Sequence, residues 1–402
     1  MSQVIATTDN QSAVMEKIAA IADELEAEAV PSEELGKLTD RAVELLQGAD
    51  VTKVFLATEL GGMGMYPGEA FPILDRVSQV DGSIGWVNTI FAAAGNVVGF
   101  LSEDASRELY RDEAPLFGVV SNGGGQAVKV GGGWRVTGSW RYASGSKHAS
   151  YIFCPAMKVV DGEMVPMPAG YGFFLVPTSQ ITYGGGWDTL GLRATGSVDV
   201  SCADAFVPEE HVANLFAPPQ LGGRAAAGGF FVLVSLMHLG FATGITRRIL
   251  DEIALFANRP ATRPGAKRVA EGERFRVEFA KKEMEAAAAR ALVVEVLADI
   301  DDTLRAGGSV SRRQTSLLKG ASIQAHDVAR DVATWAFRRG GGVALRDGTL
   351  QRAIRDALAG CQHFIVDDSH LAGVGHDLLG APDNFVWMGV DFVELPPQPG
   401  SA

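Results

Sequence analysis

The stretch of sequence that decides the fold is WRVTGSWRYASGSKHA, residues 134–149. Apolar and polar residues alternate from Trp134 to Thr137, which is the period-two pattern of a β-strand with one buried face. The run then reaches a Ser–Gly pair at Ser144, and such pairs favour a turn. Taken alone, the stretch predicts a strand that ends in a turn.

Further short β-type runs follow at residues 151–153, 171–177 and 197–201. Glycine or proline clusters separate these runs at short intervals, which leaves no room for crossover helices. The spacing therefore predicts an antiparallel sheet or barrel over residues 116–213, and it argues against βαβ units.

Helical patterns occupy the chain before this region. Residues 11–47 predict two helices with a break at residues 30–32, where Ser32 can cap the second helix. Residues 68–113 predict further helices, and Asp81-Gly82-Ser83 marks a turn and a helix start within them.

From about residue 225 the helical patterns return. Ser311 and Gln314 have the spacing of a capping box, and residues 349–372 predict a last helix. The order of elements predicts an α+β protein in three parts. These are an N-terminal helical domain (1–115), a central antiparallel β domain (116–213) and a C-terminal helical bundle (214–402).

Composition narrows the function. The 402 residues exceed one ordinary core, and a net charge of −13 disfavours binding to nucleic acid. The three cysteines lie far apart in the sequence, so neither a disulfide framework nor a metal site is expected. The first residues lack the basic head and apolar run of a secretory signal, which makes the cytoplasm the expected compartment.

One segment, residues 225–246, contains no Asp, Glu, Lys or Arg. Its length could span a bilayer, but it also carries Ser235, His238 and several glycines. A helix that is apolar all round also suits the centre of a bundle or an oligomer. We therefore expect a buried helix and no membrane contact.

The α–β–α order, together with the glycine cluster at residues 61–64, resembles the acyl-CoA dehydrogenase superfamily over nearly the whole chain. Residues 134–149 resemble the family segment in which a strand leads to the edge of the flavin. The version here is similar to that of two-component monooxygenases, such as hydroxyphenylacetate and steroid-phenol hydroxylases and their indole-oxidising relatives. Residues 187–197 resemble the same branch.

The resemblance implies roles for residues at the flavin edge. Tyr142 takes the position of the aromatic residue that stacks on the flavin. Ser144 takes that of the hydroxyl residue beside flavin N5 and O4. Ser144→Ala is therefore expected to shorten the life of the oxygenated flavin. Further cofactor contacts are expected at Ser121, Asn122, Trp140 and Gly145.

Phosphate contacts are implied in the C-terminal bundle. Arg259 resembles the arginine that reaches the flavin pyrophosphate of a neighbouring subunit. Arg338 and Gly341 lie where the family has an adenine-side loop, but arginine replaces its glutamine, so FAD and FMN both stay open. A capped helix with solvated arginines is the alternative interpretation. Together with the uncharged helix, these residues predict a homotetramer.

A flavin acyl-CoA dehydrogenase needs a carboxylate to remove a proton from its substrate. At the two places where the family carries that glutamate, this chain has Val234 and Phe364. The resemblance therefore implies an oxygenase that uses reduced flavin and O2 through a C4a-hydroperoxide. The flavin would be FAD, with FMN possible. Because no nicotinamide fingerprint is visible, a separate NAD(P)H-dependent flavin reductase is expected as the partner.

His363 is the candidate imidazole that takes the proton of the substrate, with a core histidine as the alternative. Phenol-hydroxylating members carry a histidine where this chain has Ala94. Indole-like heteroaromatics and amines therefore stand beside phenols as expected substrates. The expected substrate contacts are Trp86, Asn96, Arg193 and Phe364, although Arg193 is as well suited to a structural ion pair.

Two rival functions stay open at this point. The first is a dehydrogenase or oxidase that acts on a non-CoA substrate with an unrecognised base. The second is a non-catalytic relative kept as a binding protein.

Overall fold

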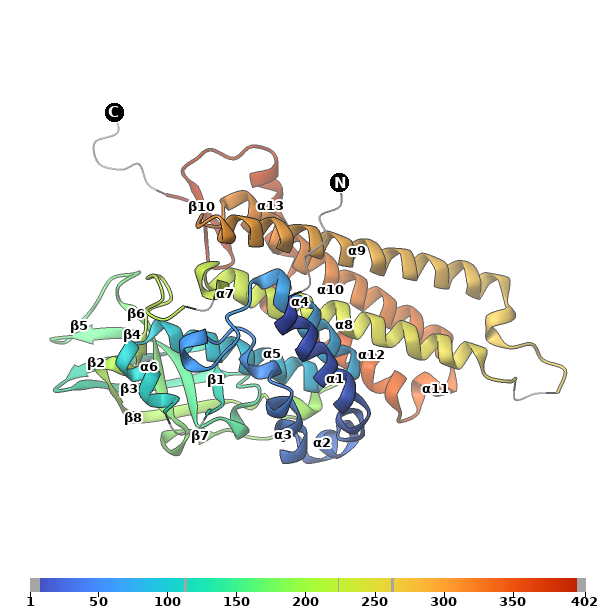
Figure 1. Cartoon of the computed structure of the whole chain (residues 1–402), viewed down its shortest axis with the longest axis horizontal. Helices are drawn as coiled ribbons and strands as arrows, with labels where there is room; N and C mark the ends of the chain where they lie inside the picture. Colours follow the sequence, from blue (N-terminus) through green and yellow to red (C-terminus); the bar gives the residue numbers. More distant parts are fainter. Residues whose placement is uncertain (1–7, 112–113, 223, 262–263, 396–402) are drawn as a thin grey trace.

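The computed structural model describes residues 8–111, 114–222, 224–261 and 264–395. Short helices and a β-sheet lie together at one end of the molecule, and the long helices α8, α9 and α10 extend from them as a bundle (Figure 1). The order of helices, strands and helices confirms the predicted α+β class.

The helices before the sheet are α1 (Asp9–Ala27), α2 (Ala29–Leu35), α3 (Asp40–Gly48), α4 (Pro67–Val80), α5 (Gly82–Val97) and α6 (Glu103–Leu109). The predicted break at residues 30–32 is wrong. Pro31 fits the first turn of α2, and the chain instead breaks at Glu28 and at Gly36, whose φ of 66° ends that helix. Asp81 starts α5 as predicted, because its carboxylate accepts the Ser83 and Ile84 N–H groups.

The sheet contains β1 (Phe117–Val119), β2 (Asn122–Val130), β3 (Gly133–Arg141), β4 (Tyr151–Val160), β5 (Glu163–Met164), β6 (Tyr171–Pro177), β7 (Thr182–Tyr183), β8 (Val200–Pro208) and β9 (Val212–Ala213). The expectation of a purely antiparallel sheet is wrong, because β4 runs parallel to β1 and β2. After β3 the chain does not return as a hairpin. Residues 142–150 carry it across β2, and β4 enters on the far side.

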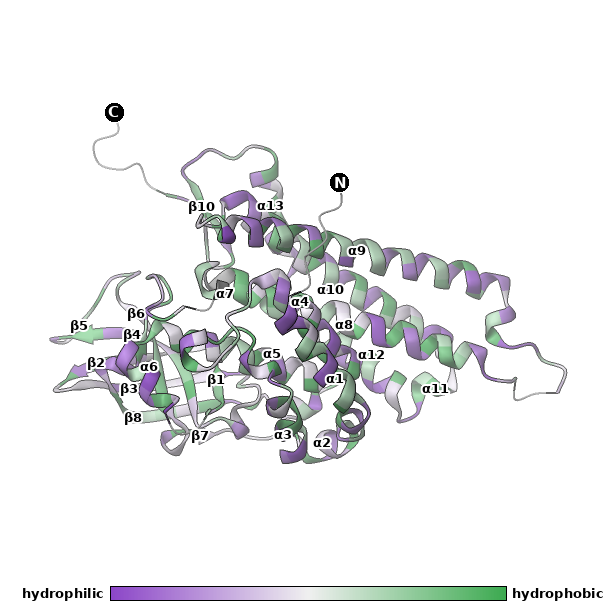
Figure 2. Ribbon diagram, viewed as in Figure 1, coloured by the Kyte–Doolittle hydropathy of each residue, from purple (hydrophilic) through white to green (hydrophobic). Residues whose placement is uncertain are grey.

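The C-terminal elements are α7 (Arg224–Ala227), α8 (Phe230–Asn258), α9 (Glu273–Arg305), α10 (Arg312–Gly340), α11 (Gly342–Leu345), α12 (Thr349–Gly360), α13 (Leu371–Leu378), β10 (Phe385–Met388) and β11 (Asp391–Glu394). The predicted capping box of Ser311 and Gln314 opens α10. Hydrophilic and hydrophobic residues alternate along α9, as they do in a helix with one face toward the bundle (Figure 2).

The predicted last helix, residues 349–372, is wrong in its length, because α12 ends at Gly360. Asp367 caps a new turn by accepting the Ser369 N–H, so the segment breaks into short pieces before α13. His363 consequently lies in the connection after α12 and caps the 3₁₀ turn η9 (Phe364–Val366).

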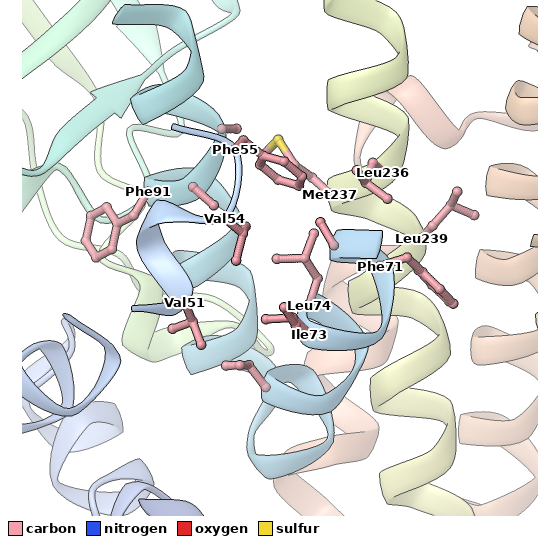
Figure 3. Packing of buried hydrophobic residues seen from close by; sticks show 14 of the residues in the cluster. Val51, Val54, Phe55, Phe71, Ile73, Leu74, Phe91, Leu236, Met237 and Leu239 are labelled. Carbon is pink, nitrogen blue, oxygen red and sulfur yellow. The ribbon is translucent and has the colours of Figure 1, made fainter. Parts of the chain in front are cut away.

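The uncharged segment forms much of α8, which packs between α4 and α10. Leu236 and Leu239 of α8 lie beside Phe71 and Leu74 of α4 (Figure 3). The two backbones approach so closely that a Cβ at Gly244 would lie 2.4 Å from the carbonyl oxygen of Asp75. The expected buried helix is therefore present within the described residues.

Among the described residues one helical stretch, Gly82–Phe100, is long and apolar enough to cross a membrane by its composition. In the structure 94% of this window is buried inside the protein. It consists mainly of α5, which forms a wall of the cavity described below.

Candidate active site

A cavity of about 630 Å³ lies where the sheet meets the two sets of helices. Its walls come from α5, the start of β2, the turn after β3, α8 and the connection after α12. This volume is ordinary for a small-molecule site. Seven of the residues expected at the site line it: Trp86, Ser121, Asn122, Tyr142, Ser144, His363 and Phe364.

A chain of hydroxyl groups fixes the polarity of Ser144. Thr195 donates to the carbonyl oxygen of Leu192 at 2.7 Å, and its Oγ1 lies 2.6 Å from Ser197 Oγ. Ser197 therefore donates to Thr195, and Ser144, at 2.6 Å from Ser197 Oγ, donates to Ser197. The indole N–H of Trp86 donates to Ser144 Oγ at 3.2 Å. Ser144 thus keeps one lone pair free to accept another hydrogen bond.

Tyr142 has an unusual backbone conformation, with φ at 65°. A tyrosine rarely adopts this left-handed conformation, and the neighbouring hydrogen bonds hold it there. Ser144 N–H donates to the Tyr142 carbonyl at 2.9 Å, and Ala143 N–H donates to Val198 at 3.0 Å. The side chain of Tyr142 stays 49% exposed at the cavity, edge-on to Trp187.

Three histidines meet beside Trp86, although they come from three separate segments. His238 lies on α8, His326 on α10, and His363 after α12. The ring centroids of His238 and His363 are 4.4 Å apart, and that of Trp86 lies 5.4 Å from His238. His238 and His363 line the cavity, while His326 lies behind them.

Hydrogen bonds determine which nitrogen of each ring carries the proton. His326 Nδ1 lies 2.9 Å from the carbonyl oxygen of Ser322, which can only accept, so His326 Nδ1 is the donor. The Nε2 of neutral His326 then accepts from His238 Nδ1 at 3.4 Å. His363 Nδ1 accepts the Ile365 N–H, also at 3.4 Å. In their neutral forms, His238 therefore has a lone pair on Nε2, and His363 has its proton on Nε2.

Burial keeps these rings uncharged. It lowers the pKa of His326 and of His363 to about 4. Burial also lowers the pKa of His238 well below its usual value, and the neighbouring His363 and His326 lower it further. All three imidazoles are neutral near pH 7, which is the state that the tautomer assignment requires.

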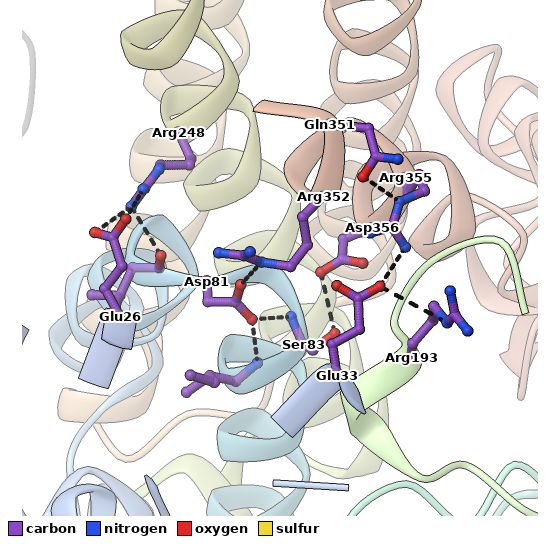
Figure 4. A network of polar contacts seen from close by, with 12 residues as sticks. Glu26, Glu33, Asp81, Ser83, Arg193, Arg248, Gln351, Arg352, Arg355 and Asp356 are labelled. Atoms are coloured by element: carbon purple, nitrogen blue, oxygen red, sulfur yellow. Dashed lines mark hydrogen bonds and ion pairs between the residues drawn. The ribbon is translucent and has the colours of Figure 1, made fainter. Parts of the chain in front are cut away.

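A buried ion-pair network holds the walls of the cavity together (Figure 4). Arg352 of α12 pairs with Asp81, the cap of α5, at 2.8 Å. Asp356, also on α12, accepts from Ser83 Oγ at 3.1 Å and from Leu192 N–H at 2.6 Å. The same Leu192 receives the end of the hydroxyl chain through its carbonyl group. Burial and the nearby Asp81 raise the pKa of Asp356.

Four residues expected at the site lie nearby but do not line the cavity. Trp140 is fully buried in the sheet core, where it donates to the Pro155 carbonyl. Gly145 packs against α5 and donates its N–H to Thr195. Asn96 is buried elsewhere on α5 and its Oδ1 has no hydrogen-bond partner. Arg193 is directed to Glu33 at 3.8 Å, in agreement with the structural ion pair left open for it.

The residues expected at the flavin phosphates lie on the bundle surface. Arg259 is exposed at the C-terminal end of α8. Arg338 and Gly341 are exposed at the end of α10. None of the three lines the cavity of this single chain.

Several residues at the site were not predicted as site residues, among them Ser197 of the hydroxyl chain and the two histidines His238 and His326. His238 is the one histidine in the uncharged segment, residues 225–246, and burial of its polar ring there costs free energy. His326 lies 88 residues further along the chain, and no local motif links it to His238. Only the packing of α8 against α10 reveals the pair.

Comparison with known proteins finds a matching family model and several relatives. Residues 236–368 match the model of the acyl-CoA dehydrogenase C-terminal domain. The chain is 28% identical to the pigment production hydroxylase of Rhodococcus erythropolis, over 88% of this chain and 92% of that protein. It is also 28% identical to the indole-3-acetate monooxygenase of Pseudomonas putida, over 84% of this chain and 86% of that protein.

A third relative is the flavin-dependent monooxygenase oxygenase subunit HsaA of Mycobacterium tuberculosis, 28% identical over 89% of this chain and 93% of that protein. Among solved structures, the 3-HSA hydroxylase of Rhodococcus sp. RHA1 superposes with a TM-score of 0.85 at 24% identity, covering 93% of this chain and 98% of that one. Residues 236–368 thus match the acyl-CoA dehydrogenase C-terminal domain, the chain has an acyl-CoA dehydrogenase-like fold, and its homologues include a flavin-dependent monooxygenase oxygenase subunit and an indole-3-acetate monooxygenase.

Proposed function

We propose that this chain is the oxygenase component of a two-component monooxygenase that uses reduced flavin and O2 to oxidise a small aromatic or heteroaromatic molecule. One observation carries the proposal. Among the described residues, those that line the cavity include two imidazoles and the Ser144 hydroxyl but no Asp or Glu. The cavity is therefore equipped for oxygen transfer and has no carboxylate to remove a substrate proton.

The residues present fit a flavin ring. Tyr142 offers a half-exposed aromatic face, and Ser144 Oγ offers a free lone pair to a ring N–H. Ser121 and Asn122 add polar groups to the same cavity. When bound, the reduced flavin would supply the electrons that activate O2. We take reduced FAD as the cofactor, with FMN as the second choice.

In this proposal, the side chains of the cavity orient the cofactor and exclude water from it. Trp86 and Ser197 hold Ser144 as an acceptor, so that a donor on the cofactor is kept in place. Apolar groups such as Ile90, Leu233 and Met237 line much of the rest of the cavity and exclude water. Exclusion of water protects a reactive oxygen species from unproductive decay to H2O2.

The alternative is a dehydrogenase or oxidase that acts on a non-CoA substrate. Val234 and Phe364, which stand at the two base positions of the dehydrogenases, both line the cavity. Neither side chain can accept a proton. Asp356, the buried carboxyl group nearest to Phe364 in the sequence, already accepts hydrogen bonds from Ser83 Oγ and Leu192 N–H. The alternative therefore has no carboxylate base among the described residues that line the cavity.

The assembly belongs to the same proposal. A homotetramer would place the exposed Arg259, Arg338 and Gly341 against the flavin of a neighbouring subunit. It would also cover the exposed apolar side chains of Met284 and Leu292 on α9. We further propose a cytoplasmic enzyme that receives reduced flavin from a separate NAD(P)H-dependent reductase.

The test supplies chemically reduced FAD, without any reductase, to the purified protein together with O2 and a panel of phenols and indoles. We expect hydroxylated product from at least one aromatic, with H2O2 as the minor product. The control is oxidised FAD with NADH, which should give no product. If a panel compound instead bleaches oxidised flavin without O2, the chain is a dehydrogenase and the proposal fails.

A further inference from the structure

We propose that His238 is the base that accepts the proton of an ionisable O–H or N–H group on the aromatic substrate. His326 positions it, and His363 acts as the opposing hydrogen-bond donor. This inference rests on the proposed function and narrows its substrate class. It also moves the proton-accepting role, expected at His363 from the sequence, to a residue on helix α8.

A hydrogen bond to the backbone fixes the tautomer of His326. The backbone carbonyl of Ser322 is an acceptor in every protonation state, so it fixes the proton on His326 Nδ1. His326 Nε2 is then an acceptor 3.4 Å from His238 Nδ1. His238 therefore donates through Nδ1 to His326 and has a lone pair on Nε2. The His238 ring lines the cavity.

His363 carries its proton on the opposite ring nitrogen from His238. Its Nδ1 accepts the Ile365 N–H, and the ring therefore has its proton on Nε2. The rings of His238 and His363 lie 4.4 Å apart at an angle of 49°. Side by side, one offers a lone pair and the other an N–H group. A phenol or an indole that donates to the first could be held by the second.

In the described part of the chain, the ionisable groups around the pair come from α10 and from the segment after α12. The ionisable groups that face it are His326 and Arg330 on α10, with Asp327 and Cys361 behind them. Arg330 pairs with Asp327 and is half exposed at the cavity, so the positive charge stays at the outer edge. His238 is therefore neutral near pH 7 with its lone pair available. Because burial lowers its pKa, it is a weak base, and it takes the substrate proton only while formation of the C–O bond makes that proton more acidic.

The chemistry balances as follows. His238 Nε2 takes the O–H or N–H proton as the C–O bond forms, which raises the electron density of the ring carbon that attacks oxygen. One oxygen atom of O2 enters that carbon, and the C–H proton lost there restores the O–H or N–H group. The second oxygen atom leaves as water with the proton from His238 and one proton of the reduced flavin; the other flavin proton stays on the new hydroxyl group, and the two electrons also come from the reduced flavin.

The first experiment reads the tautomers in the flavin-free wild-type protein. Long-range ¹H–¹⁵N NMR correlations of the histidine side chains report which ring nitrogen carries the proton. We expect His238 to be protonated on Nδ1 and His363 on Nε2. The reverse assignment at His238 would overturn the proposal, and no variant has to fold for this result.

The second experiment uses His238→Gln, which keeps a hydrogen-bonding group of similar reach but cannot act as a base. With the best neutral phenol of the panel, we expect product formation to slow by roughly a hundredfold or more. With a ring-fluorinated analogue that is already ionised at the assay pH, the loss should be severalfold at most. Equal losses with both substrates would contradict a role in proton transfer.

Variants of His326 separate positioning from packing. His326→Gln keeps an acceptor for His238 Nδ1–H and should retain most activity, whereas His326→Leu should behave like His238→Gln toward the neutral phenol. If both variants are equally active, His326 has no positioning role and the proposal falls. Should the wild type itself fail to oxygenate any aromatic in the panel, the proposed function fails instead, while the tautomer result stands on its own.

Discussion

Trp86 donates its indole N–H to Ser144 Oγ at 3.2 Å and so joins helix α5 to the turn that follows strand β3. This bond, together with the donation from Ser144 to Ser197, leaves the hydroxyl oxygen with one free lone pair on the cavity side. A reduced flavin carries an N–H where an oxidised one carries a bare nitrogen. In the proposed arrangement, with the flavin ring beside Ser144, the polarity of this hydroxyl favours the reduced cofactor.

The first prediction concerns Ser144→Ala. Loss of one hydrogen bond costs about 1 kcal/mol, which corresponds to roughly a fivefold change in rate. We expect H2O2 release per reduced flavin to rise several-fold, with a smaller change in flavin affinity. Ser146→Ala is the matched control, because its buried Oγ has no hydrogen-bond partner and does not line the cavity. Equal peroxide yields from the two variants would reduce Ser144 to a turn residue.

The second prediction tests whether Ser197 acts through Ser144. Ser197→Ala removes the acceptor of the Ser144 proton, which allows that hydroxyl to reorient and to donate into the cavity. Peroxide yield should rise in the single variant but should not rise further when Ser144→Ala is already present. A double-mutant cycle measures this coupling, and additive effects would show that the two hydroxyls work independently.

The third prediction concerns the contact between α4 and α8. In Gly244→Ala the new Cβ would lie 2.4 Å from the Asp75 carbonyl oxygen, and backbone on both sides cannot yield. We expect the free energy of unfolding to fall by about 1–3 kcal/mol or more. Gly48→Ala, at the end of α3 where a Cβ meets nothing within 4 Å, should change it by no more than about 0.5 kcal/mol. Denaturant unfolding of wild type and both variants measures these changes in the free energy of unfolding.

The fourth prediction uses a buried carboxyl group outside the cavity. Asp301 Oδ1 accepts the Gly68 N–H at the start of α4, whereas Oδ2 is buried without a partner. Burial raises the pKa of Asp301 from 3.8 to about 7. Between these values the folded protein holds a proton that the unfolded chain releases, so this group makes stability fall as pH rises.

Asp301→Asn should remove that pH dependence. Its unfolding free energy relative to wild type should increase between pH 5 and pH 8, by about 3 kcal/mol, because the group titrates over about two pH units in this window at about 1.4 kcal/mol per unit. Parallel stability curves for the two proteins would show that Asp301 is ionised in the folded state at both pH values.

Local patterns predicted much of the fold because they act over a few residues. The alternation in residues 134–149, the Asp81 cap and the capping box at Ser311 each specify structure within one strand or one turn. The parallel placement of β4 could not be predicted in this way, because it depends on which side of β2 the chain enters. The end of α12 was missed because its apolar spacing continues past Gly360.

The site shows the same division. Tyr142, Ser144 and His363, which were predicted from sequence motifs, all line the cavity. Trp140 does not line the cavity, although the regular alternation of side chains along a strand would put it on the same face as Tyr142. The positive φ of Tyr142 turns the chain and separates the two side chains. His238 and His326 required the tertiary structure, since neither α8 nor α10 carries a sequence signal for their contact.

The most direct test of the account follows the oxygen atoms. The purified protein is supplied with reduced FAD, ¹⁸O2 and the aromatic compound from the panel that it oxidises best, and the product is analysed by mass spectrometry. The account predicts one ¹⁸O atom in each product molecule, with no label when ¹⁸O is supplied as water. A product that contains no oxygen from O2, formed equally well when O2 is absent and oxidised flavin is present, would contradict it.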